Sequence, residues 1–377
     1  MSAGTESGKR GKAPKTAHGK VPLWQTEIRF RLLSQKNMRS AIPKIDFYFD
    51  FNRIAFMLSD FFIGVDKSNL RKCCRSEREE KNMKKTVFTG AATAIITPMN
   101  ETGVDYETFA RLIDWQIDSG IDAIVAAGTT GEGSTLSDEE HREVLKFVIN
   151  HTAKRVPVIA GTGSNDIAYA IDLTKFACDA GADAMLVVTP YYNKATQGGL
   201  IKSFSAIADA STKPIIMYNV PSRTGCNIAP ETCAVLCEHP NITAVKEACG
   251  DISHVAKTAA LTKGKLDIYS GNDDQIVPIM SLGGKGVISV LSNILPRETS
   301  DMCKYYLQGD VKKSAEMQLK YLELINALFC EVNPIPIKAA MAKMGFGENR
   351  LRLPLTQMEE QNAEKLYTIM RNLGIIE

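Results

Sequence analysis

The feature that most constrains the fold is a series of eight short apolar runs, separated by amphipathic segments, that starts near residue 91. They follow one another at a spacing of roughly 25–30 residues, as strands that alternate with helices do. The runs span residues 92–99, 123–128, 157–163, 184–190, 214–221, 242–248, 266–271 and 286–291. Helical periodicity between them covers residues 105–119, 137–152, 166–179, 197–210, 251–262 and 273–282. Strands that are apolar throughout belong to a parallel sheet covered on both faces. The pattern predicts an α/β fold, a closed (β/α)8 TIM barrel.

A doubly wound open sheet is the structural alternative. Such a sheet usually carries a GxGxxG turn after its first strand, whereas residues 96–103 here read ITPMNETG. Further helical patterns follow the eighth run, near residues 297–307, 310–330, 334–344 and 356–372. Because a barrel needs one closing helix, the rest predict a C-terminal helical appendage. We therefore expect a catalytic barrel over residues 84–305 and a helical region over residues 306–377.

Residues 1–83 differ from the rest of the chain in charge and in pattern. They hold 17 Lys and Arg against 9 Asp and Glu, and they show no repeat and no clean periodicity. The segment Met83-Lys84-Lys85-Thr86 resembles a bacterial protein start, and the residues before it fit purine-rich codons. We expect a basic N-terminal extension that is disordered or is translated upstream sequence. A transit peptide and a nucleic-acid-binding arm on a scaffold barrel are the alternatives.

The cysteines, histidines and apolar runs argue against several classes of protein. The nine cysteines are scattered without a CxxC pair, and the five histidines form neither HxxxH nor HxH. Reduced thiols in a cytoplasmic protein fit this pattern better than disulfides or a zinc site. We expect no metal and no cofactor. No apolar run reaches about 18 residues, so we also expect no membrane span.

Polar residues gather where the predicted strands end. The second, fourth and fifth runs lead into GTTGEG (128–133), TPYYN (189–193) and YNVPSRTG (218–225). The sixth run ends at Lys246-Glu247, and the seventh leads into SGNDD (270–274). In a (β/α)8 barrel these carboxyl ends meet at the face that carries the chemistry.

Lys246 is the most informative of these residues. A lysine at a strand end is more often a side chain that extends its ammonium to solvent than a nucleophile. Lys246, however, follows the apolar residues ITAV and would enter a poorly solvated barrel mouth. Desolvation favours the neutral form of an amine, and a neutral amine can attack a carbonyl to form a Schiff base. The lack of a metal-binding pattern agrees, because an aldolase-type enzyme stabilises its carbanion with a metal or an imine.

The other strand ends supply the groups that such chemistry needs. Tyrosine and threonine hydroxyls can relay protons. Gly128 and Gly131 would let backbone N–H groups approach a small anion, and Thr129 and Thr130 add hydroxyls that suit a carboxylate. Arg223 could bind a second carboxylate through two parallel hydrogen bonds. A plain tight turn, a packed tyrosine pair and a surface charge are the alternative readings of these features.

Four motifs in order, GTTGE, VTPYYN, YNVPSRTG and VKEACGD, resemble those of the pyruvate-dependent class I aldolase family. The resemblance covers about residues 86–377. It implies that Lys246 forms a Schiff base with pyruvate and that Tyr218 is the central proton donor and acceptor. It also implies a proton relay through Thr130 and through Tyr192, which reaches in from a neighbouring subunit. The remaining implied contacts are Thr129, Thr130, Gly271 and Ile288 with pyruvate, and Arg223 with L-aspartate 4-semialdehyde.

The resemblance therefore implies a condensation of these two substrates that leads to diaminopimelate and lysine. It implies no cofactor, a homo-oligomer built as a dimer of dimers, and neither nucleic acid nor membrane as partner. Other members cleave N-acetylneuraminate or 2-keto-3-deoxy sugar acids; they generally lack the arginine of the SRTG motif, so Arg223 favours the condensation. A phosphate-binding barrel isomerase is the alternative from another class. Its anion loop would be the glycine cluster 283–286, which precedes the last run and so lies at the wrong end of the barrel.

Feedback inhibition is a separate expectation. Lysine-inhibited members of the resembled family bind lysine at a dimer interface, and His141, Asn165 and Tyr191 match that pocket. Asp138 and Tyr169 depart from it, because a histidine and a glutamate would be expected there. Without that glutamate the ligand's ammonium loses its charged partner, so we expect lysine inhibition to be weak or absent.

Overall fold

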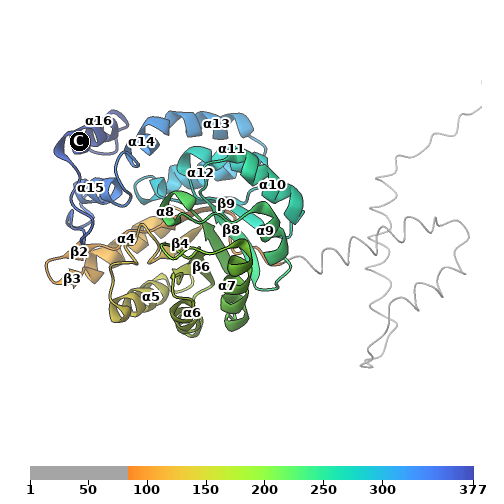
Figure 1. The fold of residues 1–377 in the computed structure, drawn as a ribbon. Helices are drawn as coiled ribbons and strands as arrows, with labels where there is room; N and C mark the ends of the chain where they lie inside the picture. Colours follow the sequence, from red (N-terminus) through yellow and green to blue (C-terminus); the bar gives the residue numbers. More distant parts are fainter. Residues whose placement is uncertain (1–83) are drawn as a thin grey trace, which may run out of the picture. The chain divides into compact units, whose positions relative to one another are not determined.

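The computed structural model describes residues 84–377, so the predictions for residues 1–83 lie outside the described part of the chain. Its centre is a closed barrel of parallel strands in the order β1-β10-β9-β8-β7-β6-β5-β4 (Figure 1). The strands are β1 (Gly90–Ala94), β4 (Ala123–Ala126), β5 (Val158–Gly161), β6 (Ala184–Val188), β7 (Ile215–Asn219), β8 (Ile242–Glu247), β9 (Asp267–Ser270) and β10 (Gly286–Ser289). Each predicted run overlaps one of these strands. The predicted (β/α)8 fold is confirmed.

Helices cover the outside of the barrel. They are α4 (Tyr106–Asp118), α5 (Asp138–Thr152), α6 (Ile167–Ala180), α7 (Gln197–Ala210), α8 (Pro221–Thr224), α9 (Pro230–Leu236), α10 (Ile252–Thr262), α11 (Ile276–Ser281) and α12 (Pro296–Leu307). Polar caps start several of them: Asp105, Ser137, Asp166, Thr196 and Asp251 each accept a hydrogen bond from a first-turn N–H. The short helices α8 and α9 were not among the predicted segments. Both begin at a proline, whose fixed φ suits the first helical position.

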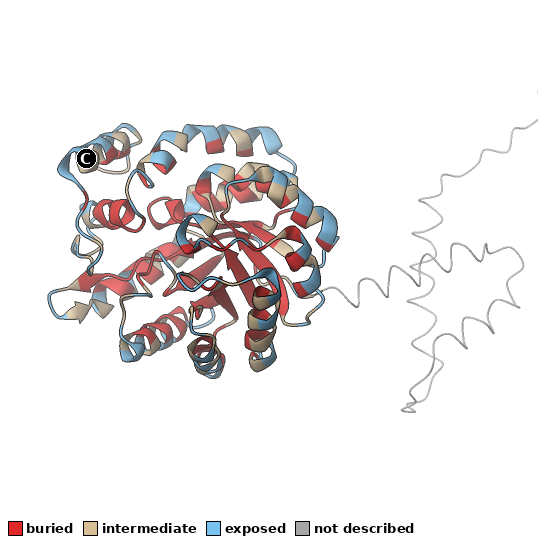
Figure 2. Cartoon of the chain, viewed as in Figure 1, coloured by how far each residue is buried: buried red, intermediate tan, exposed pale blue. Residues whose placement is uncertain are grey.

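The strands separate two sets of buried side chains. Figure 2 shows the barrel strands buried and the outward faces of the helices exposed. In β8, Ala244 belongs to the inner cluster, with Ala248 just beyond the strand, whereas Val245 packs in the outer layer. Successive residues of a strand point to opposite faces. Lys246 therefore faces the barrel interior between two alanines, which leave space around its side chain, and Glu247 faces the surrounding helices.

Glycine allows the barrel to close between its first and last strands. Gly90 and Gly286 are paired in register, and a Cβ on Gly286 would lie only 1.8 Å from the carbonyl oxygen of Gly90. Gly286 also has a φ of +145°, which residues with side chains rarely adopt. The glycine cluster 283–286 thus contributes to barrel closure at the amino end of β10, away from the carboxyl strand ends.

The first predicted run, 92–99, is not one strand. β1 ends at Ala94, and Met99–Asn100 (β2) pairs instead with Gly103–Val104 (β3) as a small antiparallel hairpin. Pro98 lies between them and cannot donate a ladder hydrogen bond. Side chains hold the intervening segment: the Ile96 N–H donates to Asn293 Oδ1 at 3.1 Å, and Thr97 Oγ1 donates to the Gly131 carbonyl at 2.7 Å.

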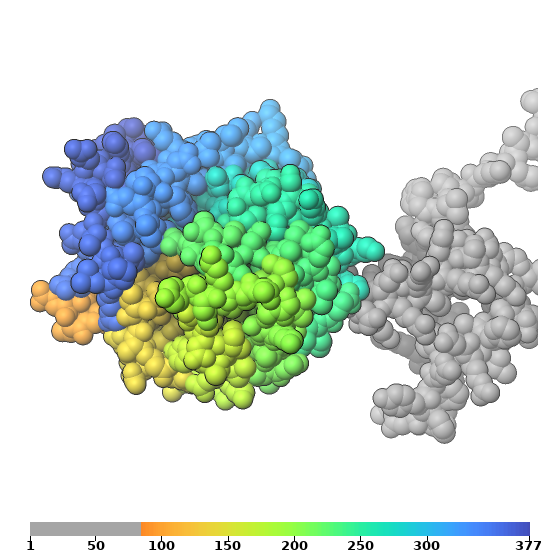
Figure 3. Space-filling model, in the orientation of Figure 1, coloured from red at the N-terminus to blue at the C-terminus, as the bar shows by residue number. Residues whose placement is uncertain are grey.

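The predicted C-terminal helices are present as α13 (Val311–Lys320), α14 (Leu322–Ala327), α15 (Ile335–Lys343) and α16 (Glu360–Asn372). The predicted segment 310–330 is divided into two helices at Tyr321. α15 is buried along most of its length. Figure 3 shows the blue C-terminal residues against the orange β2–β3 hairpin, where Arg350 Nη2 lies 3.5 Å from Glu101 Oε1. Within residues 84–377, no helix combines the length and apolarity that crossing a membrane requires.

Candidate active site

Lys246 and Tyr218 are neighbours inside the carboxyl end of the barrel. They are paired in register between β8 and β7, and Lys246 Nζ lies 4.4 Å from the centroid of the Tyr218 ring. Lys246 is 5% exposed and Tyr218 is 7% exposed. A primary amine beside a phenol in a nearly dry site can combine nucleophilic attack with proton transfer.

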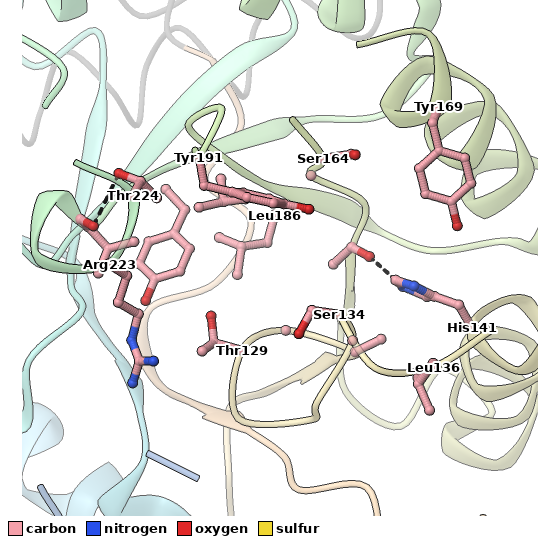
Figure 4. Close-up of a pocket in the computed structure, with 18 residues that line it drawn as sticks. Thr129, Ser134, Leu136, His141, Ser164, Tyr169, Leu186, Tyr191, Arg223 and Thr224 are labelled. Carbon is pink, nitrogen blue, oxygen red and sulfur yellow. Dashed lines mark hydrogen bonds between the residues drawn. The ribbon is translucent and has the colours of Figure 1, made fainter. Parts of the chain in front are cut away.

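A cavity of about 460 Å³ lies over the carboxyl ends of β4 to β7. Tyr218, Thr129 and Arg223 contribute to its lining, as do Tyr191, His141 and Tyr169. Figure 4 shows Thr129 and Arg223 on one side of the cavity and His141 and Tyr169 on the other. The cavity therefore joins the region of Tyr218 to the residues at the starts of α5 and α6.

The two threonines of the loop after β4 have different surroundings. Thr129 is exposed and lines the cavity. Thr130 is buried, and its Oγ1 accepts a hydrogen bond of 3.0 Å from Asn333 Nδ2. Glycine suits position 131 of this loop, because a Cβ there would lie 3.1 Å from the Ile95 carbonyl oxygen, which is a tight contact. The loop thus presents one hydroxyl to the cavity and uses the other for a contact with the C-terminal region.

Arg223 lies in the short helix α8, which follows β7 directly. Its Nη2 donates to the Asn333 carbonyl oxygen at 3.0 Å, and its side chain lines the cavity. Asn333, which immediately precedes α15, therefore contacts both Thr130 and Arg223. The sequence reading missed this residue, because no motif surrounds it and it lies 110 residues beyond Arg223.

A buried ion pair anchors the same loop to α15. Lys338 Nζ lies 2.6 Å from Glu132 Oε1, and both side chains are almost fully buried. Lys338 also donates to the Thr97 carbonyl, and the Arg352 N–H donates to Glu132 Oε2. Burial lowers the pKa of Lys338, although the Glu132 carboxylate opposes that shift. The predicted C-terminal helices therefore also support the carboxyl end of the barrel.

Asp273 is a buried carboxyl group that the sequence reading did not single out. Its Oδ2 accepts hydrogen bonds from the N–H groups of Val290 and Leu291, at 3.0 and 2.9 Å. Burial raises the pKa of Asp273, and hydrogen bonds together with the charge of Lys246 act in the opposite direction. Because Lys246 influences this carboxyl, Asp273 is part of the electrostatic surroundings of the amine.

The remaining predicted residues do not line the cavity. The Gly271 N–H donates to the Glu247 carbonyl at 2.7 Å. Ile288 is fully buried in the inner cluster of the barrel. Tyr192 is 92% exposed, with a φ of +68°, and does not line the cavity. The structure thus gathers Tyr218, Thr129 and Arg223 around the cavity. Lys246 contacts Tyr218 but does not itself line the cavity, and Tyr192 is exposed.

Comparison with known proteins gives the family. The model of the dihydrodipicolinate synthetase family matches residues 87–373. The chain belongs to the dihydrodipicolinate synthetase family.

Curated relatives in this family are similar over nearly their whole length. The 4-hydroxy-tetrahydrodipicolinate synthase of Lachnoclostridium phytofermentans is 58% identical, over 77% of this chain and 99% of that protein. The enzyme of the same name from Caldicellulosiruptor bescii is 55% identical, over 77% of this chain and 98% of that protein. The family match begins at residue 87 and so leaves out residues 1–83.

Solved structures in the family share the fold. The dihydrodipicolinate synthase from Acinetobacter baumannii, solved in complex with pyruvate, has a TM-score of 0.76 and 46% identity, covering 77% of this chain and 100% of that one. The enzyme from Thermotoga maritima has a TM-score of 0.76 and 40% identity, with the same coverage. A family member from Cyanidioschyzon merolae, with a TM-score of 0.75 and 38% identity over 78% of this chain and 100% of that one, was solved with lysine bound.

His141 and Tyr169, two of the residues compared above with the lysine-binding pocket, line the other side of the cavity. His141 Nε2 donates to the Gly161 carbonyl at 2.9 Å, and burial lowers the pKa of this histidine (Figure 4). The Tyr169 hydroxyl donates to Asp138 Oδ1 at 2.9 Å, and Arg142 Nε donates to Asp138 Oδ2 at 2.9 Å. Burial and the Asp138 carboxylate raise the pKa of Tyr169 to about 12. Tyr169 is therefore a neutral donor at physiological pH.

One group of side chains in residues 84–377 could hold a metal ion: Glu247, Cys249 and His254. It lies on the side of β8 opposite Lys246, outside the barrel interior. The sequence predicts no metal anywhere in the chain, and that remains a prediction.

Proposed function

We propose that the chain is a 4-hydroxy-tetrahydrodipicolinate synthase, a hydro-lyase that condenses pyruvate with L-aspartate 4-semialdehyde through a Schiff base. The observation that carries the proposal is the buried amine of Lys246, 4.4 Å from the centroid of the Tyr218 ring at the carboxyl end of the barrel. Membership of the dihydrodipicolinate synthetase family and relatives of that name at up to 58% identity support it.

In the first step, the Lys246 amine attacks the C2 carbonyl of pyruvate. The resulting carbinolamine loses water to give an imine, and loss of a C3 proton gives an enamine. The enamine carbon then attacks the aldehyde of the second substrate, and cyclisation of the adduct releases Lys246. Tyr218 is the proposed proton donor and acceptor for these steps, since the centroid of its phenol ring lies 4.4 Å from Lys246 Nζ.

The proposed proton relay involves Thr129 in preference to Thr130. The family resemblance assigned the relay to Thr130 and Tyr192. Thr129, however, lines the same cavity as Tyr218, whereas the Thr130 hydroxyl is buried and bonded to Asn333. We retain Thr129, the loop backbone, Gly271 and Ile288 as proposed contacts of the pyruvate carboxylate.

Arg223 is the proposed contact of the second substrate's carboxylate. It lines the cavity, and the Asn333 carbonyl bound to Nη2 restricts the guanidinium to that side. A bidentate carboxylate contact requires such a fixed, planar fork. Sugar-acid lyases of the same family are the second candidate, and Arg223 favours the synthase over them.

A homo-oligomer is part of the proposal. Tyr192 is a large side chain that is 92% exposed, with its backbone in the left-handed region. A buried aromatic contact with a second copy would remove this apolar surface from water. We propose that Tyr192 completes the relay of a partner subunit, within a dimer of dimers in the cytoplasm.

The experiment that tests the function offers the purified chain three sets of substrates. Pyruvate with L-aspartate 4-semialdehyde is expected to give the condensation product. A coupled reductase that consumes this product measures its formation. N-Acetylneuraminate and a 2-keto-3-deoxy sugar acid are expected to release no pyruvate, measured with lactate dehydrogenase. Pyruvate release from either sugar acid without the condensation would replace the synthase with a lyase.

A further inference from the structure

A polar cluster lies directly behind the strand that carries Lys246. Glu247 ends β8, Cys249 lies in the following loop, and His254 lies in the first turn of α10. The ligand atoms of these three side chains all lie within 4.8 Å of one another. Because Glu247 and Lys246 are adjacent in the strand, they face opposite sides of the sheet. The cluster is therefore separate from the cavity and from the proposed imine.

His254 contributes a nitrogen that makes no hydrogen bond among residues 84–377 and faces the Glu247 carboxylate. Its Nε2 is buried without a hydrogen bond, and the side chain is only 10% exposed. The nearest acidic atom, Glu247 Oε2, lies 3.5 Å away, which is too long for a good hydrogen bond. A buried nitrogen without a hydrogen bond carries a cost in stability. A ligand between His254 and Glu247 would remove that cost.

The Glu247 carboxylate is held in one orientation. Asn219 Nδ2 donates to both of its oxygens, at 2.9 and 3.0 Å. The Cys249 N–H donates to Oε1 at 2.9 Å, so the less saturated oxygen, Oε2, is the one that faces His254. Ligating carboxylates in metal sites are fixed by such hydrogen bonds from outside the coordination shell.

Cys249 supplies the third potential ligand. Its Sγ is half-buried, and the surrounding hydrogen bonds are long: Sγ lies 3.7 Å from the Asp251 carbonyl oxygen and 3.4 Å from the Asp251 N. Burial, followed by the charge of Glu247, raises the pKa of the Cys249 thiol to about 12. Coordination would convert the thiol to a thiolate, so that the S–H proton passes to solvent as the metal–sulfur bond forms.

We propose that Glu247, Cys249 and His254 bind a divalent cation of the zinc type, with water as the fourth ligand. A thiolate, an imidazole and a carboxylate together suit Zn²⁺, whereas Mg²⁺ and Ca²⁺ prefer oxygen ligands alone. The ion would join the end of β8 to the first turn of α10. It would therefore stabilise the segment that follows Lys246 without entering the reaction.

Co²⁺ is a suitable probe, because a cobalt–thiolate bond gives a charge-transfer absorption that nitrogen and oxygen ligands do not. The full-length protein is freed of metal with a chelator, titrated with Co²⁺, and then titrated with Zn²⁺ in competition. The wild-type protein is expected to show the charge-transfer band, to lose it when Zn²⁺ displaces Co²⁺, and to melt at a higher temperature with Zn²⁺. The control variant Cys330→Ser, which alters an exposed cysteine, is expected to behave in the same way.

Cys249→Ser is expected to lose the band, and His254→Gln is expected to weaken Co²⁺ binding at least about tenfold. Both variants should melt near the wild-type temperature when no metal is present. Cys73 and Cys74 are present in every variant, so the difference between variants reports on this site alone. Absence of a thiolate band in the wild-type protein, or a band of equal intensity in Cys249→Ser, would overturn the proposal.

Discussion

The Nζ atom of Lys246 lies over the ring of Tyr218, 4.4 Å from its centroid, because the two residues occupy paired positions of β8 and β7. Backbone register therefore fixes the distance between the proposed nucleophile and its proton carrier. Alanines on both sides of Lys246 along the interior face leave room for a substrate carbon beside the amine. Sites built on strands hold their side chains more precisely than sites built on loops.

Variants of Thr129 and Thr130 test which of the two hydroxyls relays protons and which one only stabilises the fold. Thr129→Val should lower kcat about 10- to 100-fold, because it removes the hydroxyl proposed to carry protons to Tyr218. Thr130→Val should mainly reduce stability, by about 1 kcal/mol, since its hydroxyl accepts from Asn333 inside the protein. Steady-state kinetics and chemical unfolding of both variants make the comparison. A larger kcat loss in Thr130→Val would return the relay to that residue.

Arg223 is expected to act on one substrate only. Arg223→Ala should raise KM for L-aspartate 4-semialdehyde and lower kcat/KM about 10- to 100-fold, because a charged hydrogen bond contributes about 1.5–3 kcal/mol. Imine formation with pyruvate should stay close to wild type. Arg297→Ala removes an exposed arginine of α12 and is the matched control. Equal losses of imine formation and of semialdehyde use would count against the assignment.

The ion pair between Lys338 and Glu132 is expected to be essential to the folded state. Lys338→Met should reduce the free energy of unfolding by about 3–5 kcal/mol, because it leaves a buried carboxylate without its partner. The double variant Lys338→Met/Glu132→Gln should recover part of that loss, since no charge is then buried. Urea unfolding at one fixed protein concentration provides the comparison. A single variant as stable as wild type would show that the pair does not support the site.

Much of the fold could be predicted from the sequence because its elements are periodic and local. A buried parallel strand is apolar throughout, and the caps of α4 to α7 lie beside the helices that they start. The run at 92–99 was misread because apolar residues continue past Ala94, the last residue of β1. The helices α8 and α9 are too short to show a period.

The candidate site could be predicted only where its residues lie in motifs at strand ends. Lys246, Tyr218, Thr129 and Arg223 follow from that rule. That rule does not predict Asn333 or Lys338, because tertiary packing brings them to the site from far along the chain. It also does not predict the partners of Glu247, whose local spacing is ordinary. The different surroundings of Thr129 and Thr130 also depend on packing, since two adjacent identical residues look alike in sequence.

Lysine is expected to be a poor inhibitor. Tyr169 presents a neutral hydroxyl that already donates to Asp138, and Asp138 also pairs with Arg142. The amine of a bound lysine would therefore find no free carboxylate from these three residues. Tyr169→Glu should increase inhibition, whereas Tyr169→Phe should leave it unchanged. Activity assays across a range of lysine concentrations test this, and inhibition of the wild-type protein at sub-millimolar lysine would contradict it.

The most direct measurement is reductive trapping of the protein with pyruvate and borohydride, followed by mass mapping of the modified peptide. The account predicts that pyruvate becomes attached at Lys246 and that Lys246→Arg abolishes both the attachment and turnover. An unmodified Lys246 peptide, attachment at another lysine, or full turnover by Lys246→Arg would contradict it.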